Sequence, residues 1–319
     1  MVLFPHFSKG RWLIPSFFGR VRHLYSPLFE RGDTEGLENT VKKNHGTKMK
    51  LALIQQKASD DVNANIKMAI HSVKDAAKNG ANIICFAELA FTPFYPQRPA
   101  NKNKLDLAET IPGPTTEIFT KLAKELGVVI ILNLYEKDGE NTYDSSPVIN
   151  SNGEILGVTR MIHITDYACF HEKGYYTPGN NGAPVYDTKF GKIGVAICYD
   201  RHYPEYMRAL ALNGAEIVFI PQAGAVGEWP EGLYEAELRV ASFQNGYFTA
   251  LCNRVGKEEC LTFAGESFIC NPEGSVIARA AGGDEEILFA DIDLEKVKTS
   301  HAKRLFLRDR RPELYSDWF

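Results

Sequence analysis

Two reactive side chains follow apolar segments in this sequence. Glu88 comes directly after residues 83–87 (IICFA), and Cys198 comes directly after residues 193–197 (IGVAI). Short apolar runs rich in β-branched residues predict buried strands, and the loops at strand ends often carry function in α/β proteins. A carboxylate beside a thiol would make a nucleophile with its own general base. The structural alternatives are a buried apolar cysteine and a solvated glutamate.

The residues after Cys198 predict an environment that stabilises a thiolate. Pro204 is typical of the first turn of a helix. The partial positive charge of a helix N-terminus and the guanidinium of Arg201 would both favour the charged form of the thiol. We therefore expect a lowered pKa at Cys198.

Strands that alternate with helices must position these residues. We expect strands at residues 50–55, 82–87, 128–134, 146–150, 154–159, 192–198, 215–221 and 247–252, and helices at 60–78, 115–125, 204–212 and 231–243. The alternation indicates an α/β architecture, and the similarity of the two halves indicates two sheets packed together with helices outside. No linker divides the halves, so we expect a single domain at residues 49–319.

Charge divides the chain into two unlike parts. The sequence has 36 Lys+Arg against 40 Asp+Glu, a net charge of −4, yet residues 1–48 alone contain eight basic and four acidic residues. The overall balance excludes a strongly basic nucleic-acid binder. We interpret residues 1–48 as a disordered leader and linker or a mispredicted start before Met49, with a targeting segment as the alternative.

Several other classes of protein are disfavoured by missing patterns. The six cysteines form no CxxC pair and have no zinc-type histidine spacing, which predicts reduced thiols in a cytoplasmic protein and no metal site. No apolar run is long enough to span a bilayer. The motifs GxGxxG, GxxxxGK[ST], GxSxG and HExxH are absent, which argues against common nucleotide-binding, serine-hydrolase and zinc-protease folds.

Four longer segments limit the protein families to which the chain could belong. They are residues 86–91 (FAELAF), 157–164 (GVTRMIHI), 170–179 (FHEKGYYTPG) and 194–200 (GVAICYD). In order and spacing they resemble the carbon-nitrogen hydrolase (nitrilase) superfamily. The resemblance implies a four-layer α-β-β-α sandwich that assembles through its outer helices into homo-oligomers and uses neither a metal nor an organic cofactor.

The resemblance also implies roles for three residues. Glu88 matches the general base of the family, Cys198 matches the nucleophile, and Glu172 matches a second glutamate that supports the site. Cys198 would attack the substrate carbon, and Glu88 would pass the thiol proton to the leaving ammonia or amine. A thioacyl enzyme would form, and water would then hydrolyse it.

Three further residues are candidates for substrate binding. His163 matches a pocket histidine of the family, and Arg201 matches an arginine that holds a substrate carboxylate, although it could instead pair with Asp200 or Glu205. Tyr95 would line the pocket unless it belongs to the core. The expected substrate is a small N-carbamoyl (ureido) amino acid or amine, and a nitrile or an aliphatic amide is the alternative.

The sequence departs from the family at Met161, where a catalytic lysine normally faces the oxyanion. Methionine offers no hydrogen-bond donor, and loss of one such donor costs about 2.7–4 kcal/mol. Three explanations are open. Lys173 or Arg201 could supply the cation, the chemistry could have diverged, or the chain could be a non-catalytic relative that binds a ligand or partner. An ordinary member of the family would find Met161→Lys harmless or activating.

Overall fold

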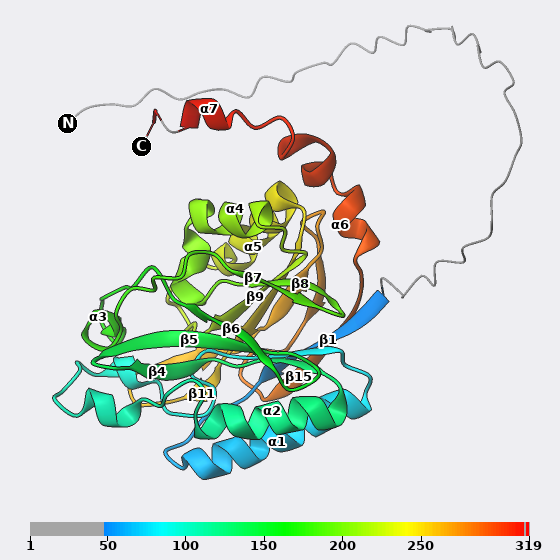
Figure 1. Ribbon diagram of the computed structural model, residues 1–319. Coiled ribbons are helices and arrows are strands. Elements are labelled where there is room, and N and C mark those ends of the chain that lie inside the picture. Colours follow the sequence, from blue (N-terminus) through cyan, green and yellow to red (C-terminus); the bar gives the residue numbers. More distant parts are fainter. Residues whose placement is uncertain (1–47, 316, 319) are drawn as a thin grey trace, which may run out of the picture. The chain divides into compact units, whose positions relative to one another are not determined.

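The computed structural model describes residues 48–315, 317 and 318 (Figure 1). Of the expected leader, residues 1–47 lie outside the described residues. Lys48, one residue before Met49, already belongs to the first strand.

Two mixed β-sheets form the centre of this part of the chain. In spatial order the strands of the first sheet are β15 (Glu286–Asp293), β1 (Lys48–Gln55), β2 (Ile83–Phe86), β3 (Val129–Ile131), β5 (Asn141–Ile149) and β4 (Leu134–Asp138), and β6 (Ile155–Arg160) pairs with β5. Those of the second sheet are β14 (Val276–Arg279), β13 (Phe268–Cys270), β10 (Phe248–Asn253), β9 (Ile217–Gln222), β8 (Gly191–Val195) and β7 (Val185–Thr188). A separate hairpin consists of β11 (Val255–Lys257) and β12 (Thr262–Ala264).

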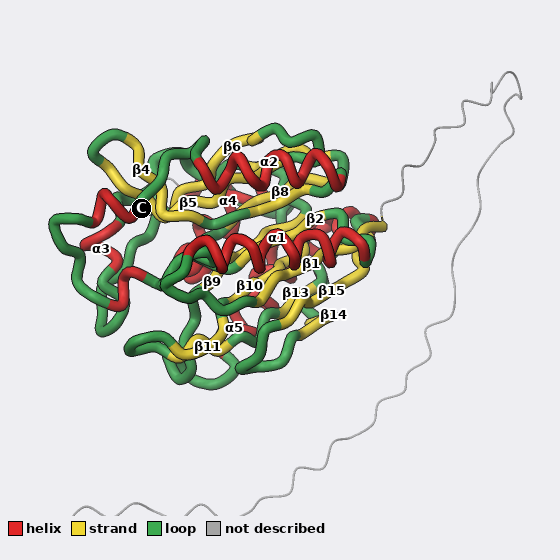
Figure 2. Tube along the Cα trace, turned by 90° about the horizontal axis from the view of Figure 1, so that it is seen from below, coloured by secondary structure: helices red, strands yellow, loops and turns green. Residues whose placement is uncertain are grey.

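Helices cover the outer face of each sheet. The long helices are α1 (Val62–Lys78), α2 (Pro114–Leu126), α4 (Pro204–Leu212) and α5 (Leu233–Asn245). In Figure 1, α1 and α2 lie below the first sheet and α4 and α5 lie above the second, and Figure 2 shows α1 and α2 side by side. The shorter segments are η1 (Tyr95–Gln97), η2 (Lys104–Leu107), α3 (Glu172–Tyr175), η3 (Cys198–His202), α6 (Glu295–Thr299), η4 (Ala302–Phe306) and α7 (Pro312–Tyr315).

Three apolar layers hold the four structural layers together. Leu53 and Cys85 of the first sheet pack toward Val195 and Phe219 of the second, which places the central core between the sheets. Two further cores lie between each sheet and its own helices. Because successive side chains of a strand point to opposite faces, both faces of the central strands are apolar and buried. This arrangement confirms the predicted α-β-β-α sandwich.

Two predicted elements differ from the structure near the site. The strand expected at 192–198 ends at Val195, and Cys198 instead begins the 3₁₀ turn η3. The reason is local backbone geometry, because Cys198 has a φ of 41°, in the left-handed region that no strand residue occupies. The strand expected at 128–134 is divided into β3 and the start of β4.

The cysteine prediction was wrong for one pair. Cys169 and Cys260, 91 residues apart in sequence, form a disulfide between the loop before α3 and the loop that joins β11 to β12. The other four cysteines, Cys85, Cys198, Cys252 and Cys270, are free and buried. None of the helices in the described residues combines the length and the apolar character needed to cross a bilayer.

Candidate active site

Glu88 lies directly beyond the buried strand β2, where the chain turns away from the sheet. Leu89 has a φ of 45°, so the backbone enters the left-handed region immediately after the carboxylate. The backbone N–H of Leu89 donates to Asn133 Oδ1 at 2.7 Å, which fixes the turn. The Glu88 side chain is completely buried as a result.

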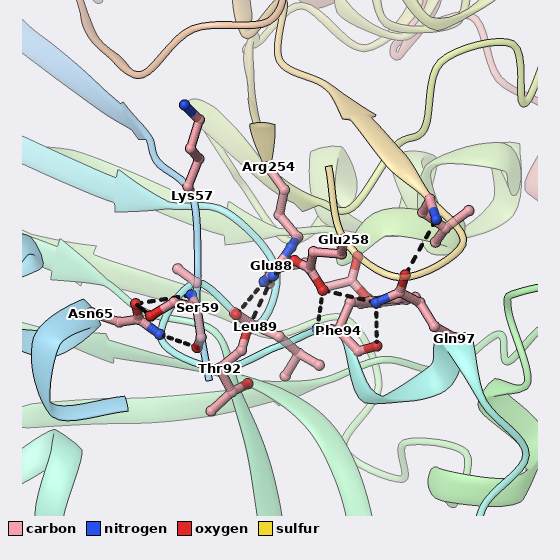
Figure 3. Close-up of polar contacts among 12 residues, drawn as sticks. Lys57, Ser59, Asn65, Glu88, Leu89, Thr92, Phe94, Gln97, Arg254 and Glu258 are labelled. Carbon is pink, nitrogen blue, oxygen red and sulfur yellow. Dashed lines mark hydrogen bonds and ion pairs between the residues drawn. The ribbon is translucent and has the colours of Figure 1, made fainter. Parts of the chain in front are cut away.

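Arg254 holds this turn from the other sheet (Figure 3). Its Nη1 donates to the carbonyl oxygens of Glu88, at 3.0 Å, and Leu89, and its Nη2 donates to that of Thr92 at 3.1 Å. Glu258 forms an ion pair with the same guanidinium. Arg254 directly follows β10, so the hydrogen bonds tie the Glu88 turn to the second sheet. Arg254 was not predicted as a site residue because no local motif in the sequence marks it.

Cys198 occupies the equivalent place beyond β8. Arg201 Nη1 donates to the carbonyl oxygen of Cys198 at 2.8 Å and to Gln222 Oε1 at 2.9 Å, which supports the left-handed turn. A non-glycine residue held at positive φ is strained, and such strain is characteristic of functional turns. The thiol is 6% exposed.

The expected lowered pKa at Cys198 was wrong. Burial, followed by the charges of Glu88 and Glu172, raises the pKa of the thiol well above its ordinary value, and the opposing effect of Arg201 is smaller. A neutral thiol is therefore the resting form, because a thiolate here would be poorly solvated and would face two carboxylates. The nucleophile needs a base.

Glu88 has the properties of that base. Burial, and next the charge of Glu172, raise the pKa of Glu88 from 4.5 to about 7, while Asp144 and Cys198 act to lower it. A carboxylate with a pKa near neutrality can accept a proton and return it within one reaction cycle. Its proximity to Cys198 makes the two groups a base and nucleophile.

Two more buried carboxyl groups adjoin this pair. Glu172 begins α3, and burial and then the charge of Asp144 raise its pKa well above the ordinary value. Asp144 lies on β5 and accepts a hydrogen bond from Asn133 Nδ2 at 2.5 Å. Burial and then the charge of Glu88 raise the pKa of Asp144 well above its ordinary range. Glu172 lies in the segment 170–179 and was expected at the site, whereas Asp144 belongs to none of the four segments and was not predicted.

Met161 lies in the same buried region as these carboxyl groups. Its side chain is fully buried, and its backbone N–H donates to the carbonyl oxygen of Asp144 at 2.9 Å. Neither candidate for a substitute cation forms an ion pair with Glu88, Glu172 or Asp144. Lys173 is exposed, and the ion-pair partner of Arg201 is Glu237, at 3.3 Å.

The three residues expected to bind substrate have different surroundings. His163 Nδ1 lies 2.7 Å from Asp200 Oδ1, and its ring stacks on Tyr203 with centroids 3.5 Å apart. Tyr95 lines a cavity of about 730 Å³ together with Arg98, Tyr175 and Glu258. None of Glu88, Glu172 and Cys198 lines that cavity.

Two nitrogens of Arg201 make no hydrogen bond within the protein. Nη1 donates to protein oxygens, Nε faces Glu237, and the guanidinium lies over the Tyr234 ring at 4.6 Å. Nε and Nη2 are both buried without a hydrogen bond, although Nε lies 3.3 Å from Glu237 Oε2. These two nitrogens form one edge of the guanidinium, the edge that can bind both oxygens of a carboxylate.

The loop at residues 223–230 adds a further carboxylate close to the thiol. Glu228 accepts hydrogen bonds from the hydroxyl groups of Tyr167 and Tyr234, each at 2.5 Å. Its charge also raises the pKa of Cys198, so this loop borders the site. Within the described residues, no three His, Cys, Asp or Glu side chains are grouped closely enough to hold a metal ion.

Comparison with known proteins shows the family to which this chain is similar. The profile of the family described as carbon-nitrogen hydrolase matches residues 50–302. The N-carbamoylputrescine amidase of Solanum lycopersicum is 37% identical over 279 residues, which cover 83% of this chain and 93% of that protein. The citrullinase of Francisella tularensis subsp. tularensis is 34% identical over 281 residues, which cover 84% of this chain and 97% of that protein.

A solved structure supports the same assignment. The crystal structure of a carbon-nitrogen hydrolase from Helicobacter pylori G27 superposes with a TM-score of 0.80 at 32% sequence identity. The superposition covers 86% of this chain and 99% of that chain. The sandwich and the order of its elements are therefore shared across nearly the whole of that protein.

Proposed function

This chain belongs to the carbon-nitrogen hydrolase family, and we propose that it hydrolyses a non-peptide C–N bond of a small ureido compound through a covalent intermediate on Cys198. One observation carries the proposal. A buried thiol with a raised pKa lies beside Glu88, a buried carboxyl group whose pKa is about 7. Such a pair can exchange a proton at neutral pH.

The proposed reaction moves one proton twice. Glu88 takes the proton from Cys198 Sγ while the sulfur attacks the ureido carbon. The tetrahedral adduct expels ammonia, which takes the proton from Glu88, and a thiocarbamate remains on the sulfur. Water then attacks the same carbon as Glu88 accepts its proton, and the departing thiol regains that proton. The released carbamate decomposes to an amine and carbon dioxide.

The substrate class rests on the relatives and on Arg201. Two relatives carry names that refer to ureido compounds, N-carbamoylputrescine and citrulline. The unengaged Nη2 of Arg201 can donate one hydrogen bond to a substrate carboxylate. We propose a small molecule as the substrate, with His163 and Glu172 as supporting residues of the site.

Met161 favours a second candidate, a non-catalytic relative that binds a small ligand. The buried methionine offers no donor to an oxyanion, so a reaction that builds one lacks a stabilising group worth about a hundred- to a thousandfold in rate. The catalytic candidate is preferred because Glu88 and Cys198 retain the proton-exchange pair that simple binding does not require.

One assay separates the two candidates. The full chain is incubated with ureido acids, ureido amines, amides and nitriles, and released ammonia is measured. The same panel is run with Cys198→Ala and with Cys270→Ala, which changes another buried free cysteine, on β13. Ammonia from the wild type and Cys270→Ala but not from Cys198→Ala supports the enzyme. Ammonia from none of them eliminates hydrolysis of these classes.

A further inference from the structure

Three buried carboxyl groups of the site form no ion pair, although the charge of Arg254 acts to lower the pKa of Glu88. The described residues contain five carboxyl side chains that are almost completely buried, at Glu88, Glu136, Asp144, Glu172 and Asp200. Two of these are paired, Glu136 with Arg160 at 2.6 Å and Asp200 with His163 at 2.7 Å. The unpaired ones are Glu88, Asp144 and Glu172, and the backbone N–H of Met161 donates to the carbonyl oxygen of Asp144. A buried carboxyl group without a cation is costly to ionise.

The three carboxyl groups act on one another electrostatically. Both oxygens of Glu88, both oxygens of Glu172 and Oδ2 of Asp144 are buried without a hydrogen bond that meets distance and angle criteria, and the side chains of Asp144 and Cys198 are the polar neighbours of Glu88. The Tyr176 hydroxyl, independently, is buried without a partner, and the charges of Asp144, Glu88 and Glu172 all act on it. Unsatisfied buried polar groups are rare in folded proteins, and at a site they point to a ligand.

The chemistry of these atoms identifies the ligand class. Carboxylate oxygens accept hydrogen bonds, and they gain most from donors that are positively charged. The carboxyl groups are not grouped to share one metal ion. A planar cation with N–H groups along several edges can instead meet several carboxylates at once. Guanidinium and amidinium groups have this form, and a guanidino group has the same shape as a ureido group.

We propose that the substrate itself supplies the missing cation, and that the site hydrolyses a small guanidino or amidino compound in preference to the ureido compound of the same shape. This inference rests on the proposed function, because it uses the same Cys198 nucleophile and Glu88 base. It extends that function by proposing that the reacting group of the substrate is positively charged.

The proposed reaction passes through no oxyanion intermediate, and its atoms and charges balance. Glu88 takes the thiol proton, and the thiolate attacks the guanidinium carbon, which gives a neutral tetrahedral adduct. Glu88 protonates one amino group, ammonia leaves, and an isothiouronium cation remains on Cys198. Water adds to that carbon as Glu88 accepts a proton, which then returns to the departing sulfur. The proton of the new hydroxyl group goes to the released ammonia, so the products are a ureido compound and ammonium.

Met161 is then suited to the reaction. A lysine at this position would stabilise an oxyanion, but it would repel a guanidinium and the cationic intermediate. A methionine is uncharged, so it does not compete with a cationic substrate for the carboxylates. In a reaction sequence, this step would supply a ureido compound, the kind of compound to which the names of the two relatives refer.

Matched pairs of compounds test the inference. The pairs are 3-guanidinopropionate with 3-ureidopropionate, and 4-guanidinobutylamine with 4-ureidobutylamine. Ammonia release by the wild type is expected to give a kcat/KM at least about tenfold higher for the guanidino member of the better pair. Met161→Lys is expected to reverse this preference, raising ureido hydrolysis by about a hundredfold and lowering guanidino hydrolysis. Met161→Leu, the uncharged control, should keep the wild-type preference.

A binding measurement keeps the test independent of how Met161→Lys folds. Cys198→Ala is titrated calorimetrically with each compound in buffers of different ionisation enthalpy. We expect the guanidino compound to bind more tightly and to release protons below neutral pH, because the cation ionises the carboxyl groups. Asp144→Asn should weaken that binding and reduce the proton release.

The outcomes separate the inference from the proposed function. Hydrolysis of ureido compounds with equal or slower hydrolysis of guanidino compounds overturns the inference and leaves the proposed function standing. Hydrolysis of neither, with the wild type folded, overturns both. Guanidino binding without proton release, or a preference that Met161→Lys leaves unchanged, also contradicts the inference.

Discussion

At the scale of single residues, Glu88 and Cys198 depend on each other. Burial and neighbouring carboxylates keep the thiol of Cys198 protonated, so it cannot act as a nucleophile until a base removes its proton. Glu88 can do this because the same burial that disfavours the thiolate also raises its own pKa, to about 7. The low polarity of the site therefore raises the proton affinity of both groups.

This match predicts the pH dependence of the reaction. Glu88 must be ionised to accept the thiol proton, so kcat/KM should rise with increasing pH and level off above about pH 7. The measurement is kcat/KM for ammonia release across the pH range. Asp144→Ala removes a group that lowers the pKa of Glu88, so its rising limb should lie at higher pH. A profile that rises near pH 4.5, the ordinary glutamate value, would contradict the assignment of the base.

Residue types revealed only part of the site. Glu88, Glu172 and Cys198 could be found because each stands in a recognisable segment, and the structure brings them into electrostatic contact. Asp144 acquires its importance from neighbours that are distant in sequence, so no local pattern marks it. Tyr176 lies in the segment 170–179, but the segment does not indicate what its hydroxyl group contacts. The expected thiolate was wrong because burial, which the sequence does not quantify, outweighs the nearby arginine.

At the scale of elements, the site depends on turns held from the opposite sheet. Arg254 crosses from the end of β10 to three carbonyl oxygens of the turn after β2. Each turn places a catalytic candidate just beyond a buried strand, where the backbone leaves the hydrogen-bonded ladder. The packing of the two sheets consequently sets the relation between base and nucleophile.

We predict that Arg254→Ala destabilises the protein and lowers its activity. The change leaves three buried carbonyl oxygens and the Glu258 carboxylate without their partner, which costs about 3–5 kcal/mol for a buried pair. Urea unfolding measures the loss. Arg98→Ala is the matched control, because Arg98 is 73% exposed and pairs with Glu259 at the surface, where the expected cost is at most about 1 kcal/mol. Equal effects of the two changes would refute the role of Arg254.

The disulfide gives a second prediction at this scale. The cross-link between Cys169 and Cys260 closes a long loop, so its loss should lower the free energy of unfolding by about 2–4 kcal/mol. Thiol labelling of the unfolded, unreduced chain should find four free cysteines, and a reducing agent should expose the remaining two. Cys260→Ser should be insensitive to the reducing agent. Six reactive thiols before reduction would instead support the sequence-based expectation.

Most elements could be predicted, whereas their pairing could not. The periodicity of residues 60–78 and 204–212 predicts helices that the structure contains as α1 and α4. The antiparallel pairing of β15 with β1 joins the last strand of the sequence to the first sheet. Such a pairing between distant segments depends on the overall topology, so no local pattern in the sequence predicts it.

At the scale of the whole molecule, the sandwich leaves apolar side chains exposed on its outer helices. On α5, Val240 is 51% exposed and Phe243 is 37% exposed, and Val240 also lines a cavity of about 410 Å³ between α4 and α5. An exposed apolar patch on a helical layer is typical of an interface. The expected homo-oligomer stays a prediction, and this face is where we place its contact.

We predict that Val240→Asp shifts the protein toward the monomer. A charge in the contact would be desolvated without a partner, which weakens association. Sedimentation velocity of the wild type and the variant measures the change. Val226→Asp is the control, because Val226 is 68% exposed in the loop that follows β9. A wild type that sediments as a monomer at all concentrations would contradict the expected assembly.

The overall architecture was the most predictable feature of the chain. Alternating strands and helices, and the resemblance in four segments, led to the four-layer sandwich that the structure contains. The role of residues 1–47 and the cytoplasmic location stay predictions, because targeting depends on recognition by other proteins rather than on the packing of this fold.

The central claim is that Cys198 carries the substrate during C–N bond cleavage. Rapid quenching during turnover, followed by mass spectrometry of the peptide that contains Cys198, measures this directly. We predict a covalent adduct on Cys198 that keeps the substrate minus ammonia and disappears when substrate is exhausted. Ammonia release that continues in Cys198→Ala, with no adduct on Cys198 in the wild type, would contradict the claim.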